Sequence, residues 1–194
     1  FRPEFQNWLP FYWAGFRQTT RYTYVLPATP DLSILYATLK NTIRTDLRRA
    51  VQSLDIAECK DAALLFQLNK KSFARKGLRQ PYSDSIFQRL HSVLTERSQA
   101  VGWIAAGRQN GAPGAGLYLV FDDREAAVLL TGIDPDFRIP GALNALYWRA
   151  IQFCAERRLQ LDFEGSMQPG IERVFRGFGG RLTPYFQIRR VKFF

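Results

Sequence analysis

The sequence predicts an α/β protein built on one mixed sheet, and three observations carry this prediction. Three strand-like stretches follow one another through short connections, which is typical of an antiparallel meander. A well-patterned helix at 143–155 then leads into an alternating stretch at 159–164, as in a right-handed crossover to a parallel strand. After a glycine-bounded helix, residues 181–194 again have the composition of a strand.

Composition limits the class of protein. The chain has 194 residues, of which 46% are hydrophobic, as in a packed globular protein. No apolar run approaches the roughly 18–20 residues that span a bilayer, so we expect no transmembrane segment. Two cysteines and one histidine are too few for a disulfide scaffold or a zinc site, so we expect no metal and a reducing, cytoplasmic setting. Because the first residue is not Met, we expect the sequence to be part of a longer chain.

The net charge of +10 indicates an anionic partner, such as a nucleic acid, a membrane surface or a phosphate-bearing small molecule. The alternative is a set of arginines spread over a solvated surface. The densest group includes Arg44 and Arg48, which are four residues apart and share a helix face. Because guanidinium groups match phosphate and carboxylate bidentately, we predict that these two clamp an anionic acceptor. A solvated helix face is the other interpretation.

Residues 1–30 form an aromatic-rich segment that we set apart as the remnant or partner of a missing N-terminal half. Prolines and a glycine interrupt residues 1–18, so no long helix is expected there. We interpret the aromatic residues as core, with a surface that stacks nucleotides as the alternative. Residues 19–26 are rich in β-branched and aromatic side chains and predict a strand.

Residues 31–194 are predicted to form the main domain. Apolar residues at helical spacing predict one long helix or two over residues 30–51. A short strand is predicted at 54–59, and Asp61 and Ser83 are expected to cap the next two helices. The meander strands are predicted at 100–107, 115–122 and 126–133.

The alternating stretch 159–164 predicts the functional site. The alternation places Asp162 and Glu164 on one face, at the C-terminal end of a central strand. In open α/β sheets that end is where ligands bind. Gly165 and Ser166 end the strand, and Ser166 is expected to cap the following helix. A serine hydrolase is not favoured, since Ser166 lacks the flanking glycines of a nucleophile elbow.

The predicted order of elements resembles that of the GNAT N-acetyltransferase fold. In that family two neighbouring strands splay apart, an acyl thioester lies in the wedge, and its pyrophosphate sits on the start of the intervening helix. The resemblance therefore implies donor contacts at Thr131, Gly132 and Ile133. The phosphate loop of the family reads Arg/Gln-x-x-Gly-x-Gly/Ala, and here Arg138, Gly141 and Ala142 stand in the corresponding loop. The loop departs from the pattern at Leu143, where a small residue belongs.

A resemblance over nearly the whole chain is to a bacterial family of FemAB-like acetyltransferases, whose members carry an additional N-terminal half. It is carried by the phrases QTTRYTY (18–24), IR…RA (43–50), GID (132–134), DFEGSM (162–167), GIER (170–173) and FRGFGG (175–180). Relatives with two such domains transfer amino acids from aminoacyl-tRNA to peptidoglycan precursors, and others acylate amines. The resemblance thus implies acyl-CoA (acetyl-CoA) or aminoacyl-tRNA as donor. It implies a small-molecule or cell-wall-precursor amine as acceptor.

The mechanism implied is direct attack of an amine on the donor carbonyl. Glu164 is the first choice of general base and Asp162 the second. A backbone N–H near Gly132 or Ile133 would stabilise the oxyanion. Tyr185 or Tyr147 would protonate the leaving group, and Ser166 would contact the acceptor beside the arginine clamp.

Three less specific interpretations stay open. The carboxylates of Asp162 and Glu164 would also serve as ion-pair partners of Arg173, Arg176 or Arg181, or as helix caps. The whole chain is alternatively a basic nucleic-acid-binding module, for example for tRNA. The third alternative is a GNAT-like scaffold without catalysis, which the departure at Leu143 favours.

Overall fold

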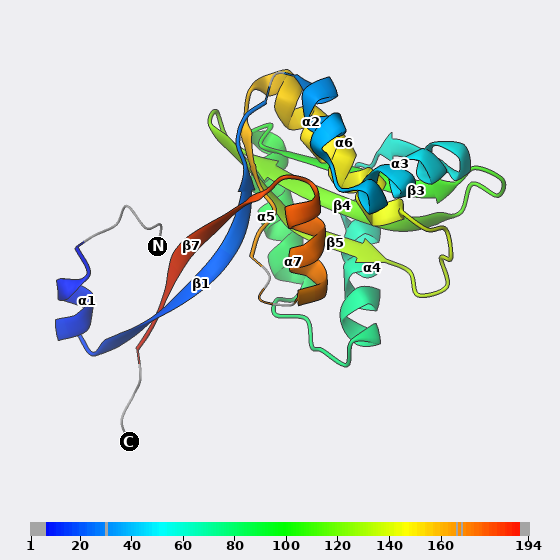
Figure 1. Ribbon diagram of the computed structural model, residues 1–194. Helices are drawn as coiled ribbons and strands as arrows, with labels where there is room; N and C mark the ends of the chain where they lie inside the picture. Colours follow the sequence, from blue (N-terminus) through cyan, green and yellow to red (C-terminus); the bar gives the residue numbers. More distant parts are fainter. Residues whose placement is uncertain (1–6, 30, 166, 168, 191–194) are drawn as a thin grey trace.

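The computed structural model describes residues 7–29, 31–165, 167 and 169–190. They form a seven-stranded mixed sheet with the order β2-β3-β4-β5-β6-β1-β7 (Figure 1). The strands are β1 (Phe16–Leu26), β2 (Leu54–Glu58), β3 (Ala100–Gly107), β4 (Pro113–Phe121), β5 (Glu125–Ile133), β6 (Gln160–Asp162) and β7 (Arg181–Arg190). The helices are α1 (Leu9–Trp13), α2 (Leu32–Thr38), α3 (Asn41–Ser53), α4 (Ala62–Arg75), α5 (Asp84–Glu96), α6 (Ala142–Arg157) and α7 (Pro169–Gly177).

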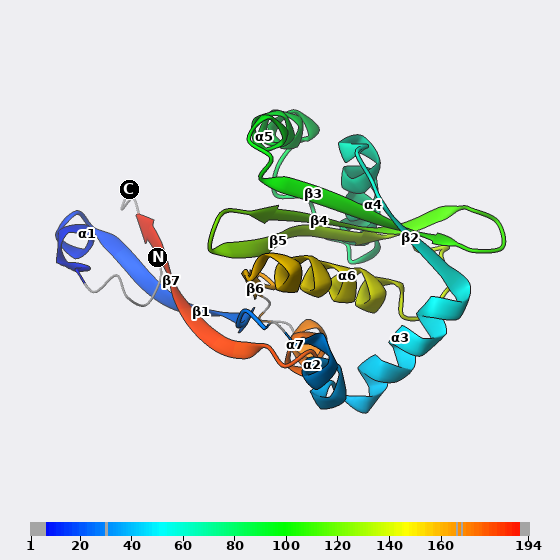
Figure 2. The same ribbon diagram turned by 90° about the horizontal axis from the view of Figure 1, so that it is seen from above.

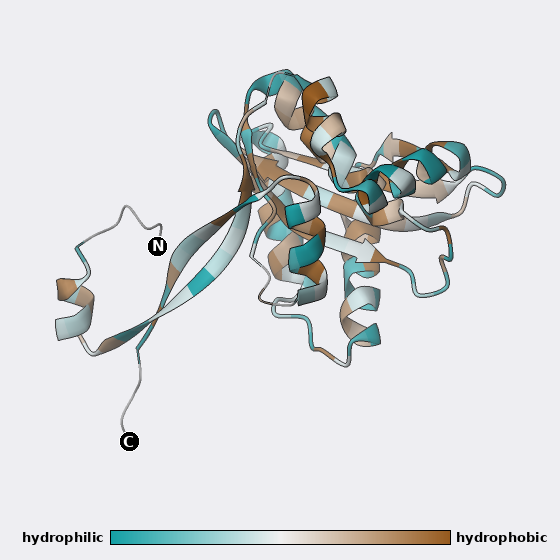
Figure 3. Cartoon of the chain, viewed as in Figure 1, coloured by the Kyte–Doolittle hydropathy of each residue, from teal (hydrophilic) through white to brown (hydrophobic). Residues whose placement is uncertain are grey.

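The helices cover both faces of the sheet. Figure 2 shows α4 and α5 on one face, and α6 with α2, α3 and α7 on the other. The larger core lies under α6, where Leu146 and Ile151 pack among buried residues that include Leu117 of β4. The smaller core lies under α4 and α5, where the Phe66 and Phe87 rings stack with centroids 4.9 Å apart. Apolar residues follow these contact faces in the hydropathy colouring of Figure 3.

Local signals in the sequence predicted most of these elements. Asp61 and Ser83 cap α4 and α5 as expected, since their side chains accept hydrogen bonds from backbone N–H groups of the first turn. The helical region of 30–51 proves to be two helices, α2 and α3. They are separate because Leu39 adopts an extended backbone, with ψ of 145°, that ends α2. The predicted strand at 54–59 is confirmed as β2.

The feature that positions the site is the separation of β5 from β6. The two strands are parallel neighbours, but they pair only through Glu125–Gln160, Ala126–Leu161 and Ala127–Asp162. Beyond Asp162 the chain turns toward β1, where Phe163 N donates to Tyr24 O at 2.9 Å. The remaining half of β5 therefore lies open toward the wedge between the strands, as the GNAT resemblance implies.

The strand predicted at 159–164 is shorter than expected. β6 ends at Asp162, and Glu164 has φ of +60°, in the left-handed region that only a few non-glycine residues adopt. Because strand alternation ends before Glu164, the prediction that Asp162 and Glu164 share one face of a strand is wrong. The two carboxylates have different surroundings.

A long two-stranded ribbon of β1 and β7 extends from the body and carries α1 at its outer end (Figures 1 and 2). The interpretation of the N-terminal aromatic residues as core is wrong for Tyr12 and Trp13, which are 63% and 73% exposed. The last strand was predicted to reach residue 194. β7 ends at Arg190, and residues 191–194 lie outside the described part of the chain. In the part that is described, we find no helix with the length and apolar character needed to cross a bilayer.

Candidate active site

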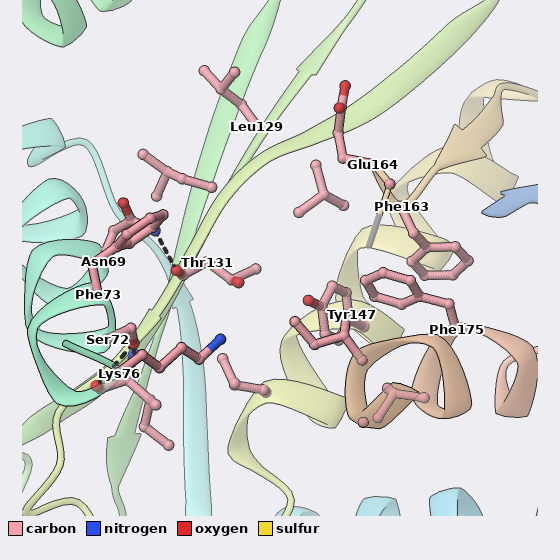
Figure 4. Close-up of a pocket in the computed structure, with 18 of the residues that line it drawn as sticks. Asn69, Ser72, Phe73, Lys76, Leu129, Thr131, Tyr147, Phe163, Glu164 and Phe175 are labelled. Carbon is pink, nitrogen blue, oxygen red and sulfur yellow. Dashed lines mark hydrogen bonds between the residues drawn. The ribbon is translucent and has the colours of Figure 1, made fainter. Parts of the chain in front are cut away.

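A cavity of about 660 Å³ opens where β5 and β6 part (Figure 4). Its walls come from the open half of β5, the segment after β6, and the facing sides of α4, α6 and α7. The lining is mainly apolar, and the principal residues are Phe73, Leu129, Leu143, Tyr147, Phe163, Ile171, Val174 and Phe175. The polar or charged lining residues are Asn69, Ser72, Arg75, Lys76, Thr131, Asn144 and Glu164. Such a mainly apolar cavity with a few polar groups is typical of a small-molecule site.

Glu164 is the carboxylate that lines this cavity. Its left-handed backbone is a local strain of the kind that concentrates at functional sites. Glu164 is exposed, but partial desolvation by the surrounding cavity walls raises the pKa of its carboxyl above the ordinary value, and the negative charge of Asp162 raises it further. A carboxylate with a raised pKa is a stronger base near neutral pH, so the surroundings suit proton abstraction.

Asp162 does not line the cavity. Its carboxylate accepts a hydrogen bond from the Thr23 hydroxyl of β1. It also accepts one from the backbone N–H of Glu164 at 2.8 Å. Asp162 therefore fixes the turn after β6 and acts on Glu164 through its charge and through this hydrogen bond.

The backbone of β5 at the wedge already has partners on α4. Asn69 Nδ2 donates to Thr131 O at 2.6 Å. Ser72 Oγ accepts from Ile133 N at 2.8 Å and contacts Ile133 O at 3.2 Å. Gly132 packs so closely on α4 that a Cβ atom there would overlap the backbone of residues 68 and 69. The predicted oxyanion donor at Ile133 is thus occupied by Ser72, which the sequence analysis had assigned no role at the site.

The start of α6 packs closely against Asp46 of α3. Gly141 has φ of +80°, and a Cβ atom there would lie 2.7 Å from the Asp46 carbonyl oxygen, so α3 fills the space beside it. Asn144, in the first turn, donates from Nδ2 to Asp46 Oδ2 at 2.8 Å. The Asp46 carboxylate therefore lies beside the first turn of α6, the helix end where an anion is favoured. Arg138 is exposed and is not among the residues that line the cavity.

Two tyrosines were considered as proton donors, and the structure places them differently. Tyr147 of α6 lies in the cavity wall, as does Thr131 of β5. Burial raises the pKa of Tyr147, and the Thr131 side chain opposes this in part. Tyr185 of β7 is outside the lining and lies close to Gly165, since a Cβ atom on that glycine would be 3.2 Å from the Tyr185 hydroxyl.

The predicted acceptor-binding residues do not gather at this cavity. Arg44 and Arg48 lie on α3, where their guanidinium groups contact Ala37 O and Thr45 Oγ1 at 3.4 Å each. Arg48 lines a second cavity of about 590 Å³ between α3, β2 and α6. The structure therefore does not bring the arginines together with Glu164. Ser166 lies outside the described residues.

Sequence reasoning missed Asn69 and Ser72 as site residues. The helical periodicity of 62–75 places Ser72 on the buried side of the helix, which faces the sheet. A polar side chain on a buried face needs a hydrogen-bond partner. The partners of Asn69 and Ser72 on β5 are more than fifty residues away in sequence, so the spacing alone does not identify them. Among the described residues, no group of three His, Cys, Asp or Glu side chains is arranged to hold a metal ion.

Comparisons with solved structures give the same fold. FemX matches with a TM-score of 0.76 and 13% identity over 98% of this chain and 70% of its own. L-PGS from Bacillus licheniformis matches with a TM-score of 0.64 and 9% identity over 97% of this chain and 65% of its own. A predicted acetyltransferase from Clostridium acetobutylicum, solved with acetyl-CoA, matches with a TM-score of 0.52 and 18% identity. That match covers 65% of this chain and 88% of the other.

These identities establish the fold alone. No curated protein sequence matches the chain. The family model described as an acetyltransferase (GNAT) domain matches residues 37–169, which include the parted strands, α6 and the walls of the cavity other than those from α7. The chain therefore belongs to the acetyltransferase (GNAT) domain family.

Proposed function

We propose that this protein is an N-acyltransferase that transfers an acyl or aminoacyl group to an amine by direct attack. The observation that carries the proposal is the cavity between the parted strands β5 and β6, with Glu164 in its lining. Its apolar walls would exclude water from an activated ester or thioester and would hold it beside the amine. Positioning of this kind contributes about 7–11 kcal/mol to the rate in favourable cases.

The proposed reaction begins with a proton transfer. The acceptor ammonium, with an ordinary pKa near about 10, gives a proton to Glu164 directly or through one water molecule. The amine nitrogen then attacks the donor carbonyl carbon, and a C–N bond forms while the C–S or C–O bond to the leaving group breaks. The leaving group takes a proton, which we assign to the Tyr147 hydroxyl in place of Tyr185 because Tyr147 lines the cavity. The attacking nitrogen still carries one excess proton, which it returns to Tyr147 as the amide forms, and Glu164 releases its own proton to solvent.

The oxyanion of the intermediate requires a hydrogen-bond donor. Ile133 N–H is a donor on the open half of β5, but it donates to Ser72 Oγ in this structure. Its use in catalysis therefore requires the Ser72 hydroxyl to release it when the substrate carbonyl arrives. One such donor contributes roughly 3–4 kcal/mol to the stability of the transition state.

The substrates are proposed as classes. The donor is an acyl thioester, such as acyl-CoA, or an aminoacyl ester of tRNA, and the acceptor is a small-molecule or cell-wall-precursor amine. The fold likeness to FemX supports the cell-wall precursor, and the likeness to the acetyltransferase solved with acetyl-CoA supports the thioester. The upstream half of a longer chain and a cytoplasmic location remain part of the proposal.

A basic nucleic-acid-binding module is the second candidate, and the β1–β7 ribbon favours it. The described residues of β1 and β7 include five arginines and no acidic residue: Arg17, Arg21, Arg181, Arg189 and Arg190. Register pairs Arg17 with Arg189 directly across the ribbon. Guanidinium groups gathered on one ribbon suit contacts with the phosphates of a nucleic acid. Both functions would be true of the same protein if the donor is aminoacyl-tRNA.

A product assay tests the transferase proposal. The protein is incubated with an amine panel and two donors, an acetyl thioester and an aminoacyl-tRNA, and N-acylated products are identified by mass spectrometry. We expect product formation that requires Glu164. Salt-dependent tRNA retention without product from either donor would instead support the nucleic-acid-binding candidate.

A further inference from the structure

The start of α6 is the place in this fold where an anionic donor group would be expected, and Asp46 of α3 packs beside it. A helix N-terminus carries partial positive charge and unpaired N–H groups, so it prefers a negatively charged neighbour. Gly141 is the N-cap residue of α6, and it has no side chain that could accept a hydrogen bond from the first turn. The Asp46 carboxylate instead bonds the Asn144 side chain of the first turn at 2.8 Å. A carboxylate of the chain itself thus lies beside the first turn of α6, where it would repel a second anion.

The packing around Gly141 points the same way. In a phosphate loop a glycine lets the ligand approach the backbone closely. Here the space that a side chain at 141 would take is already filled by Asp46, whose carbonyl oxygen and Cβ would lie 2.7 and 3.0 Å from it. The positive φ of Gly141 and this contact account for the glycine without any ligand.

The open half of β5 provides a third, independent observation. An extended donor arm with amide groups would pair with the backbone groups that β5 leaves open beyond Ala127. Thr131 O and Ile133 N–H already bond to Asn69 and Ser72 of α4. These side chains take the place of a strand partner, so they compete with such an arm.

We propose that Asp46 is a specificity-determining residue that excludes a diphosphate from the start of α6, so that the donor is held through its acyl end in the cavity. The inference deepens the proposed transferase function and rests on it for the identity of the ligand as a donor. Asp46 acts by charge repulsion of a diphosphate and by its bond to Asn144. The adenine nucleotide portion of coenzyme A then adds no affinity.

Binding measurements test this without relying on turnover. Calorimetry or thermal shift is run on the intact protein with acetyl-CoA, S-acetylpantetheine and 3′-phosphoadenosine 5′-diphosphate, since ligands of the native state raise its melting temperature. We expect equal affinity for acetyl-CoA and S-acetylpantetheine, and no shift with the nucleotide diphosphate. Asp46→Asn keeps an oxygen for the Asn144 bond but removes the charge, and it should raise acetyl-CoA affinity about tenfold relative to S-acetylpantetheine.

Asp123→Asn, an exposed acid in the β4–β5 turn, is the matched control and should change neither affinity. The proposal is overturned if the unmodified protein binds acetyl-CoA tenfold or more tightly than S-acetylpantetheine. It is equally overturned if Asp46→Asn melts like the parent protein and gains no acetyl-CoA affinity. Failure to form N-acylated product from any donor would instead refute the transferase proposal and would leave these affinities interpretable.

Discussion

The backbone N–H of Glu164 donates a 2.8 Å hydrogen bond to Oδ1 of Asp162. The sequence makes these two carboxylates look equivalent, two positions apart on one strand. The hydrogen bond shows that Asp162 holds the turn, whereas Glu164 adopts a left-handed backbone and lines the cavity. Their separate environments lead to separate predictions for their substitution.

Glu164→Gln should lower kcat by about 10²–10⁴-fold, the usual contribution of a general base. The amide keeps the size of the side chain but cannot accept the proton of the ammonium. Steady-state kinetics with the donor and amine found in the product assay measure the effect. Glu156→Gln, on the outer side of α6 where Glu156 pairs with Arg149 and Arg157, is the control and should leave kcat unchanged. Full activity in Glu164→Gln would exclude the base assignment.

Asp162→Asn should move the acidic limb of the pH profile of kcat/KM to lower pH. In the parent protein, burial and the Asp162 charge raise the pKa of Glu164 above 4.5, so the limb should lie above that value. Asparagine keeps an oxygen for the hydrogen bonds of Thr23 and Glu164 N but removes the charge. An unchanged limb would mean that Glu164 is not the titrating group.

The same raised pKa predicts how stability depends on pH. A carboxyl whose pKa is raised by folding favours the protonated form, so it stabilises the folded state below the unfolded pKa. That contribution is lost as the pH rises through the folded-state pKa of Glu164. Glu164→Gln should therefore raise the melting temperature relative to the parent at pH 7 more than at pH 4, as measured by calorimetry in matched buffers. A larger gain at pH 4 would contradict the sign of the shift.

Tyr147→Phe should lower kcat by about 10²-fold or more if Tyr147 protonates the leaving group. Tyr185→Phe should have a much smaller effect, because Tyr185 is outside the cavity lining. A donor with a leaving group of low pKa needs no proton and should restore the rate of Tyr147→Phe. A loss that persists with that donor would indicate a structural role for the Tyr147 hydroxyl.

Gly132→Ala should destabilise the protein by about 3 kcal/mol, at the upper end of overpacking effects. A methyl group at 132 would overlap the α4 backbone at Leu68 and Asn69, and backbone cannot rotate away as a side chain can. Gly170→Ala is the matched control, since nothing lies within 4 Å of a Cβ atom there and α7 includes this residue. It should stabilise by roughly 0.5–1 kcal/mol through helix propensity. Denaturant unfolding measures both.

Arg44→Ala and Arg48→Ala should change kcat/KM for the acceptor by no more than about twofold, the effect of about 0.5 kcal/mol that is usual for surface substitutions. Both side chains lie on α3, and neither lines the cavity of Glu164. Kinetics at varied acceptor concentration test this. A tenfold rise in acceptor KM without loss of stability would instead support the prediction from the sequence that Arg44 and Arg48 clamp the acceptor.

Local patterns in the sequence determined most of the elements. Side-chain oxygens at Asp61 and Ser83 marked helix starts, and the apolar spacing of 143–155 marked α6, because capping and periodicity act within one turn or one strand. The element order then indicated the fold, which the family match and the structural comparisons confirm. The partial phosphate motif at Arg138 and Gly141 was also visible in the sequence, but the packing of Asp46 against this loop was not.

Tertiary structure alone decided the surroundings of the site. Ser72 reaches Ile133 across 61 residues of sequence, and Asp46 reaches Asn144 across 98. No periodicity encodes such contacts, because they depend on how α3 and α4 pack against elements far along the chain. The orientation of Glu164 likewise follows from a backbone turn that Asp162 and Thr23 fix from two different strands. The sequence thus determined which groups the chain carries, and packing decided which of them meet.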